Sequence, residues 1–141
     1  MSQQAQIAEP AHSMLAADKS LERLGIRVLS ASEGRATAVL QVEADMANGH
    51  GIAHGGYVFA VADTAFAMAA NTFGAGIATA EADISYLSPA HIGEELVAQA
   101  EVTFHEGRRM IVDVLVRAGK RTVAVYRGSG RALRTGTEPT M

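Results

Sequence analysis

Residues 48–70 read NGHGIAHGGYVFAVADTAFAMAA, a loop rich in glycine and histidine that runs into a long apolar segment. Between residues 58 and 70 of this segment, Asp63 and Thr64 are the only polar residues. A helix that is apolar on every side is a buried helix. The stretch therefore predicts a central buried helix over residues 56–71, with one carboxylate inside it.

The remainder of the chain alternates apolar and polar residues in the manner of β-strands. The alternation is clear in residues 95–104 and 109–117, and the short connection HEGR joins them as an antiparallel hairpin. A short amphipathic helix over residues 12–23 is expected to cover one edge. The strands are expected at residues 26–30, 36–43, 77–87, 95–104, 109–117 and 121–133.

These elements predict an α+β fold in which an antiparallel sheet of five to six strands wraps around one long helix. One sheet around one helix leaves a strand edge and a face uncovered. Association of two chains is a common way to cover them.

Length and composition indicate a single domain over residues 1–141, with a core from about residue 20 to 134 and loose ends. The chain of 141 residues is 48% hydrophobic and 19% charged, which is typical of globular proteins. It contains no cysteine, which excludes disulfides, thiol nucleophiles and thiolate metal sites. No segment reaches the roughly 18–20 apolar residues of a membrane span, and the start lacks signal-peptide character. We therefore expect a cytoplasmic protein without membrane contact.

The net charge of −3 conceals a basic region, because residues 108–134 contain eight Arg or Lys residues against the single acid Asp113. Such a region is typical either of a site for a phosphate-bearing partner or of solvated strand faces. Nucleic acid is not expected as a partner. The chain is mildly acidic, and its seven aromatic residues form no stacking series beside the basic ones.

Two interpretations of Asp63 are open from the sequence. A buried carboxylate either accepts hydrogen bonds from the backbone or from a hydroxyl such as that of Thr64 or Thr79, or marks a catalytic base or nucleophile. The glycines Gly55 and Gly56 favour the second interpretation. Amides at the start of a helix stabilise the negative charge that develops in acyl transfer.

The spacing between the glycines and the acid adds a geometric constraint. Gly56 and Asp63 are seven residues apart, or roughly 10 Å along one helix axis. One carbonyl group can hardly contact both. Two helices that lie antiparallel across a two-fold axis would bring the amides of one chain to Asp63 of the other, giving two shared sites per dimer.

The histidines of the loop have a spacing that also occurs in metal sites. His50 and His54 are four residues apart, but they lie in a glycine-rich loop and no Glu follows the first, so we predict no metal site. His54 either shapes the loop or contacts a substrate carbonyl. Asn48 is either a turn residue before glycine or a second hydrogen-bond donor at the same carbonyl.

The pattern N-x5-H-G-G-x6-D of this stretch, followed by ISYLSPA and GEELVAQAEV, resembles the hotdog-fold thioesterases. Within them it is similar to the phenylacetyl-CoA thioesterase group of phenylacetate breakdown. The likeness covers about residues 20–134. It implies a hotdog fold, a dimer that commonly pairs into a homotetramer, and hydrolysis of acyl-CoA thioesters. No separate cofactor is implied, because CoA is part of the substrate.

The resemblance also implies roles for individual residues. Gly55 would supply the backbone N–H that polarises the thioester carbonyl, with Asn48 and His54 assisting. Asp63 of the partner chain would act as base or nucleophile, and Thr79 is the aligned candidate for positioning the water. Basic residues hold the CoA nucleotide in the relatives, and the candidates here, chosen by charge, are Arg108, Arg109, Arg127 and Arg131.

The sequence thus predicts hydrolysis of acyl-CoA thioesters, with aromatic substrates such as phenylacetyl-CoA or hydroxylated relatives favoured. Two alternatives stay open. One is a hotdog enoyl-CoA hydratase or dehydratase, which would use a His and an acid across the dimer. The other is a non-catalytic module that binds acyl-CoA.

Overall fold

The structure of the protein, a computed structural model, describes residues 6–74 and 76–133. It confirms the α+β class, and the six strands and the central helix end within two residues of the predicted positions. The elements are α1 (Ala11–Ala17), α2 (Ser20–Leu24), β1 (Ile26–Ser32), β2 (Arg35–Gln41), the short 3₁₀ helix η2 (Ala44–Met46), α3 (Gly55–Ala70), β3 (Ile77–Tyr86), β4 (Glu95–Glu106), β5 (Arg109–Ala118) and β6 (Arg121–Ala132).

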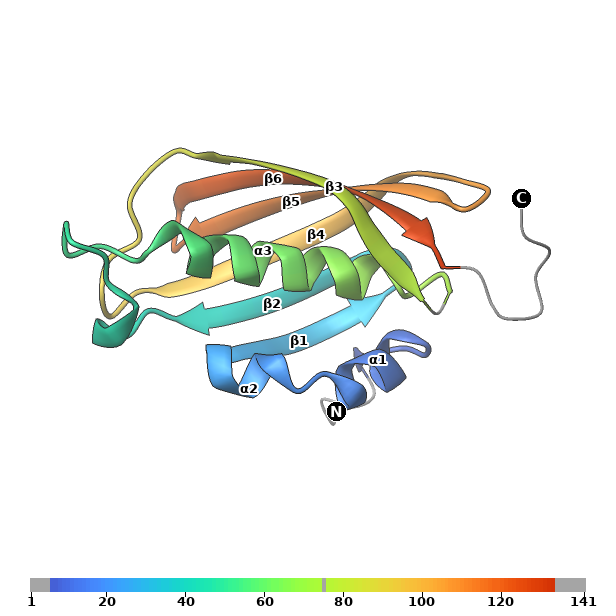
Figure 1. Ribbon diagram of the computed structural model, residues 1–141, viewed down its shortest axis with the longest axis horizontal. Coiled ribbons are helices and arrows are strands. Elements are labelled where there is room, and N and C mark those ends of the chain that lie inside the picture. The colour runs from blue at the N-terminus through green and yellow to red at the C-terminus, as the bar shows by residue number, and fades with distance from the viewer. Residues whose placement is uncertain (1–5, 75, 134–141) are drawn as a thin grey trace.

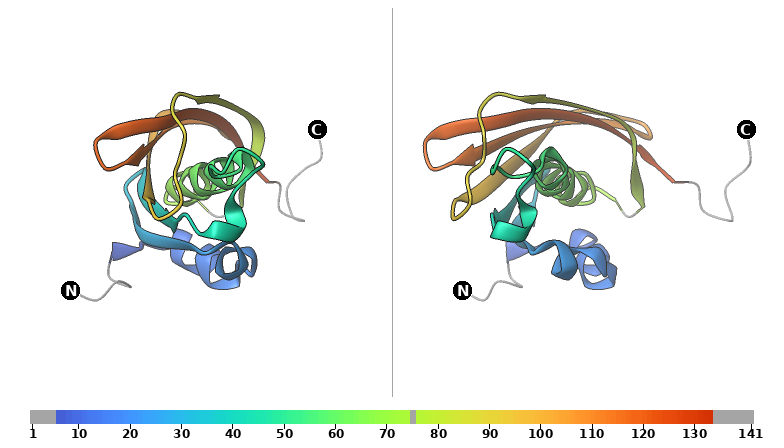
Figure 2. Two further views of the ribbon diagram at one scale, coloured as in Figure 1. Left: turned by 90° about the vertical axis from the view of Figure 1, so that its left-hand side faces the viewer. Right: turned by 60° about the vertical axis from the view of Figure 1, so that its left-hand side comes forward.

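The strands form one antiparallel sheet in the order β1-β2-β4-β5-β6-β3. The sheet curves around α3, which lies along its concave face (Figures 1 and 2). The edge strand β1 is flanked by α1 and α2, and Ile7 forms a bridge with Ala31. The other edge, β3, is exposed over residues 79–83. Within the described residues, only the β6 side of β3 is paired.

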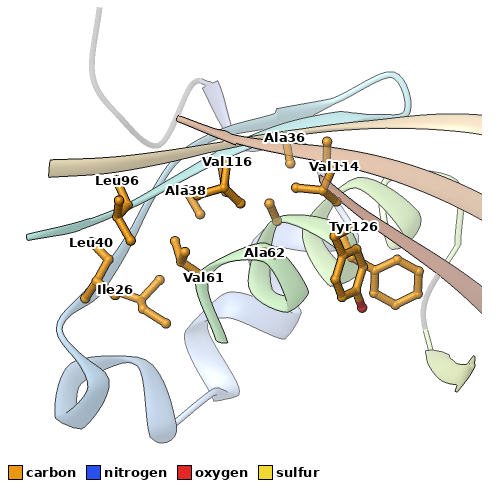
Figure 3. Close-up of a cluster of buried hydrophobic side chains, with 14 of the residues drawn as sticks. Ile26, Ala36, Ala38, Leu40, Val61, Ala62, Leu96, Val114, Val116 and Tyr126 are labelled. Atoms are coloured by element: carbon orange, nitrogen blue, oxygen red, sulfur yellow. The ribbon is translucent and has the colours of Figure 1, made fainter. Parts of the chain in front are cut away.

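The core lies between α3 and the inner face of the sheet, where small side chains let the two layers approach closely. Ala36 and Ala38 of β2 are at most 3% exposed, and Figure 3 shows them facing Val61 and Ala62 of α3. The buried residues of α3 are Val58, Val61, Ala62, Ala65, Phe66, Met68, Ala69 and Ala70. The prediction of a buried helix is therefore confirmed. None of the helices in the described ranges has the length and apolar character needed to cross a bilayer.

The N-terminal segment differs from its prediction in two respects. The single helix expected over residues 12–23 is two short helices, because the Asp18 carboxylate accepts hydrogen bonds from the N–H and the hydroxyl of Ser20, at 2.8 and 2.6 Å, and turns the chain. Ordered packing also begins earlier than residue 20. Ile7 and Ala11 are buried in the main core.

Asn71 ends α3 and fastens it to β3. Apart from the phenol of Tyr126, it is the one buried residue with a polar side chain among those that the structure describes. Its Nδ2 donates to the carbonyl oxygens of Ala67 and Ile77, at 2.8 and 3.3 Å, and its Oδ1 accepts the Ile77 N–H at 3.1 Å. One side chain therefore fixes where β3 leaves the end of the helix.

Replacing this amide by an apolar side chain of similar size is expected to destabilise the fold. In Asn71→Leu, two backbone groups of Ile77 lose their partners. Each such group costs about 1–3 kcal/mol, so we expect a loss of about 2 kcal/mol or more in the free energy of unfolding. Urea denaturation at fixed protein concentration measures it. The control Gln99→Leu removes an exposed amide and should stay within about 0.5 kcal/mol of wild type. A loss below about 1 kcal/mol in Asn71→Leu would contradict the assignment.

Candidate active site

The start of α3 presents a backbone amide without an acceptor. His54 caps the helix, and its Nδ1 accepts the Gly56 N–H at 2.9 Å. The Tyr57 N–H bonds to the His54 carbonyl oxygen at 3.0 Å. Across the described ranges, no acceptor reaches the Gly55 N–H. This free donor lies at the positive end of the dipole of a 16-residue helix.

A cavity of about 350 Å³ opens beside Gly55. Val58 of α3, Leu87 and Tyr86 form part of its wall. The Tyr86 hydroxyl donates to the Gly55 carbonyl oxygen at 3.0 Å, and a Cβ added at residue 55 would lie 3.2 Å from the Tyr86 ring. The glycine therefore allows the tyrosine ring to lie directly against the helix end.

Asn48 lines the same cavity as Gly55. Its Oδ1 accepts the N–H groups of His50 and Ile52, at 2.8 and 3.4 Å, so it holds the glycine-rich loop in a turn. The turn interpretation is therefore confirmed. A role as a donor to substrate stays a prediction, and its Nδ2 makes no hydrogen bond within the described residues.

The loop after β3, residues 87–94, forms another part of the wall, and Arg121 holds it in place. The Arg121 guanidinium donates to the Ser88 hydroxyl at 3.2 Å, to the Pro89 carbonyl oxygen at 2.9 Å and to Glu94 Oε1 at 2.6 Å. This side-chain hydrogen bond from Arg121 lowers the pKa of Glu94 and favours its charged form. The Ser-Pro and Gly-Glu elements of the sequence therefore shape this loop.

Asp63 lies midway along α3 and is partly buried. Its Oδ1 accepts a hydrogen bond from the hydroxyl of Tyr126 on β6 at 2.6 Å. The partners suggested from the sequence were wrong, because Thr64 donates instead to the Ala60 carbonyl oxygen and Thr79 makes no hydrogen bond with Asp63. Burial raises the pKa of Tyr126 above its usual value, and the hydrogen bond to Asp63 adds to this effect. The phenol therefore stays a donor through the neutral range.

The free amide and the carboxylate do not meet within one chain. Gly55 and Asp63 are eight residues apart on α3, about 12 Å along its axis. Thr79 is exposed on the edge strand β3, where it pairs with Gly130 of β6. Its role in positioning water stays a prediction.

The four candidate arginines fall into two pairs. Arg108 donates through Nε and Nη2 to the Ala132 carbonyl oxygen, at 3.0 and 2.7 Å. Arg127 donates through Nε and Nη2 to the two carboxylate oxygens of Asp113, at 2.6 and 2.9 Å. These two guanidinium groups already have partners within the chain.

The second pair has no such partner in the described part of the chain. Arg109 of β5 and Arg131 of β6 lie opposite each other in register, and both line a cavity of about 490 Å³ together with Phe104 and Glu81. Within residues 6–74 and 76–133, no ion pair or side-chain hydrogen bond engages either guanidinium. Arg134, the last of the eight basic residues, lies outside the described residues.

Comparison with known proteins places this geometry in a family. The profile of the Thioesterase superfamily matches residues 50–125, more than half of the chain, and this range contains both Gly55 and Asp63. The chain belongs to the thioesterase superfamily. It is a thioester hydrolase with the hotdog fold, as the resemblance implied.

Relatives within the superfamily match over most of their length. The acyl-coenzyme A thioesterase PaaI of Escherichia coli strain K12 is 38% identical over 125 residues, which cover 87% of this chain and 89% of the relative. The structure of PaaI from the E. coli phenylacetic acid degradation operon superposes with a TM-score of 0.87 at 34% identity, covering 94% of this chain and 97% of that one. A variant of the phenylacetic acid degradation protein PaaI from Thermus thermophilus gives 0.79 at 33% identity, covering 82% and 100%.

Sequence reasoning missed Tyr126, Tyr86 and Arg121 as parts of this thioesterase-superfamily site. Tyr126 had a detectable signal, since it brings a hydroxyl to a row of strand positions that otherwise carry Ala and Gly. Tyr86 and Arg121 had none, because their contacts depend on how the loop folds back over the helix end.

The hydrogen bond between Tyr126 and Asp63 makes an alkaline titration informative. The difference in phenolate absorbance between wild type and Tyr126→Phe isolates this phenol, which should ionise above the value of about 10 for a free tyrosine. The unfolded chain releases this proton near pH 10 while the folded chain keeps it. The contribution of the phenol to stability is therefore complete below about pH 10 and is lost as the pH rises further. A difference midpoint at or below about pH 10 would rule out the buried, paired phenol.

Proposed function

We propose that the protein hydrolyses acyl-CoA thioesters, with aryl-acetyl groups such as phenylacetyl or its hydroxylated relatives as substrates. The observation that carries the proposal is the free Gly55 N–H at the start of α3, beside a cavity. The matching relatives support the substrate class, since one is named an acyl-coenzyme A thioesterase and two come from phenylacetic acid degradation.

The Gly55 amide is the hydrogen-bond donor of the site. It donates to the thioester carbonyl oxygen and stabilises the negative charge that grows there as the carbonyl carbon becomes tetrahedral. The helix dipole adds to this effect at no cost in reorganisation. Asn48 and His54 assist from the loop that leads into the helix, and Tyr86 and Val58 line the space for the acyl group.

Asp63 of a second copy of the chain supplies the other half. Two features support a dimer with shared sites. The edge strand β3 is exposed, and a partly exposed stripe of Ala60, Asp63, Thr64 and Ala67 runs along α3. Two α3 helices placed antiparallel across a two-fold axis bring Gly55 of one chain to the carboxylate of the other. Pairing of such dimers into a homotetramer is part of the same proposal.

The chemistry can follow either of two balanced routes. Asp63 as base takes a proton from water while the water oxygen bonds to the carbonyl carbon. The C–S bond then breaks, and the departing thiolate takes up the proton to leave as the CoA thiol. Asp63 as nucleophile displaces the thiolate directly, and water hydrolyses the resulting anhydride. In both routes CoA takes part only as the leaving group, and the good thiolate leaving group makes a Ser-His pair unnecessary.

Assays on a panel of thioesters test the activity itself. Purified protein should release free CoA thiol from aromatic acyl-CoAs faster than from short aliphatic ones. Absence of release from the whole panel would overturn the proposal. Formation of 3-hydroxyacyl-CoA from an enoyl-CoA would instead identify a hydratase.

Subunit mixing tests the shared site. Asp63→Asn should lower kcat by about 100-fold or more, because the carboxylate is lost. Gly55→Pro removes the N–H at the first helical position, where proline is tolerated, and the ψ of 135° at His54 suits a following proline. We expect a loss of about 100- to 1,000-fold in kcat. Equal mixing of the two variants should restore about a quarter of wild-type activity, since half of the dimers are mixed and each has one intact site.

Gly55→Ala is the matched control for this experiment. It introduces the same Cβ contact with Tyr86 but keeps the N–H, so its loss in kcat should be far smaller than that of Gly55→Pro. Mass spectrometry shows whether mixed dimers form. If they form and remain inactive, the two groups of a site do not come from different chains, and the shared arrangement is refuted.

The CoA nucleotide is proposed to lie over Arg109 and Arg131, because these are the candidate arginines without partners in the described chain. Arg109→Gln and Arg131→Gln should each raise KM for an acyl-CoA about fivefold, as expected for one exposed ion pair, with kcat unchanged. The matching pantetheine thioester, which lacks the nucleotide, should show no change. Arg117→Gln, an exposed arginine elsewhere on β5, is the control. Equal effects on both substrates would exclude a role in nucleotide binding.

A further inference from the structure

The hydroxyl of Tyr126 is placed unusually for a residue of the core. The inward positions of β6 from residue 124 to 130 carry Ala, Tyr, Gly and Gly, so the phenol is the one polar side-chain group in this row. Tyr126 is 3% exposed, and its hydroxyl reaches Asp63 Oδ1. No hydrogen bond from the described chain reaches Oδ2, the second carboxylate oxygen.

The ring that carries this hydroxyl is fixed on two sides. Phe59 meets it edge-on, with ring centroids 5.5 Å apart at 66°, and Phe66 lies 6.0 Å away at 54°. The glycines of the GSG segment make this packing possible. A Cβ at Gly128 would lie 2.7 Å from Phe66 and 3.0 Å from Tyr126, and a Cβ at Gly130 would lie 3.3 Å from Phe66. Figure 3 shows Tyr126 beside Val114, within the buried cluster.

Phe59, Asp63 and Phe66 follow one another at four- and three-residue spacing, so they share one face of α3. The two phenylalanines therefore hold the Tyr126 ring from either side of the carboxylate that it contacts. A neutral phenol is the donor, so the hydrogen bond leaves the carboxylate its charge. Such a bond to a charged acceptor is short and strong in a partly buried setting.

We infer that Tyr126 is a positioning residue for thioester hydrolysis: its hydroxyl holds Oδ1 of Asp63 and thereby aims Oδ2 at the reacting carbonyl or water. This inference rests on the proposed function of Asp63. In this role Tyr126 acts through Asp63 rather than by contacting the substrate itself. It acts by restricting the rotation of the Asp63 side chain, which α3 alone leaves free to turn, and a misdirected carboxylate lowers the rate of the chemical step rather than substrate affinity.

The test is a double-mutant cycle on kcat. Tyr126→Phe keeps the ring and its packing, and should lower kcat about tenfold while KM stays within about twofold of wild type. In an Asp63→Asn background the same change should lower the residual kcat less than about twofold, because no carboxylate is left to orient. A residue needed only for packing would reduce kcat equally in both backgrounds. Wild-type kcat in Tyr126→Phe, or equal losses in the two backgrounds, would overturn the inference.

Tyr57→Phe is the matched control, since it removes a phenol hydroxyl without a hydrogen-bond partner in the described chain and should keep wild-type kcat. Gly128→Ala provides a second route to the same answer. Its Cβ displaces the rings of Phe66 and Tyr126, although the phenol hydroxyl and the Asp63 carboxylate are both still present. Because the displaced ring no longer holds Asp63 in place, kcat should fall with little change in KM. An unchanged kcat in a folded Gly128→Ala protein would count against the inference.

A spectroscopic measurement separates this inference from the proposed function. In Asp63→Asn the Tyr126 phenol loses its charged acceptor, so the alkaline absorbance titration should show one tyrosine ionising at lower pH than in wild type. This readout needs no thioester turnover. If the titration shifts in Asp63→Asn but the wild-type protein has no thioesterase activity, the proposed function is refuted while the contact between Tyr126 and Asp63 is kept. If the wild-type protein is active, the titration does not shift and Tyr126→Phe keeps wild-type kcat, only the inference is refuted.

Discussion

The burial of α3 in the concave face of the sheet is the interaction on which the rest of the structure depends. Alanines on both layers allow the helix to lie close to the strands. The helix is also fixed at its two ends, by the His54 cap at the start and by Asn71 at the finish. Packing along the helix and these end contacts together set where the first amide and the carboxylate at its middle lie relative to the strands.

This rigidity has a consequence for assembly, because a fixed rise per residue separates the two groups, Gly55 and Asp63, that the proposed mechanism brings to one carbonyl. The proposed dimer would overcome this separation through the side of the molecule that a single chain leaves uncovered. The exposed strand β3 and the small side chains along the outer stripe of α3 lie on the part of the molecule that a single chain leaves open. In the proposed dimer, the same association that covers this exposed surface also brings Gly55 of one chain to Asp63 of the other.

The sequence predicted most of the fold, because alternation is clear in the strands β4 and β5 and α3 is apolar all round. It failed where structure depends on one local side-chain contact, as at Asp18, or on contacts between distant segments. Gly55, Asn48 and Asp63 could be selected from one continuous stretch. Tyr126 is 63 residues from Asp63, and only the register of β6 against its neighbours brings it there. The role of Gly128 and Gly130, which provide space for the ring of Phe66, likewise appears only in the folded chain.

The cap at His54 also determines which tautomer the imidazole adopts. A neutral ring that accepts the Gly56 N–H at Nδ1 carries its own proton on Nε2. His54 therefore presents an N–H donor at its outer end, and it has no free lone pair with which to remove a proton from substrate. Protonation of the ring would give up the cap, since an imidazolium has only donors. In the proposed mechanism His54 can therefore only donate a hydrogen bond, and accepting a proton is assigned to the Asp63 carboxylate.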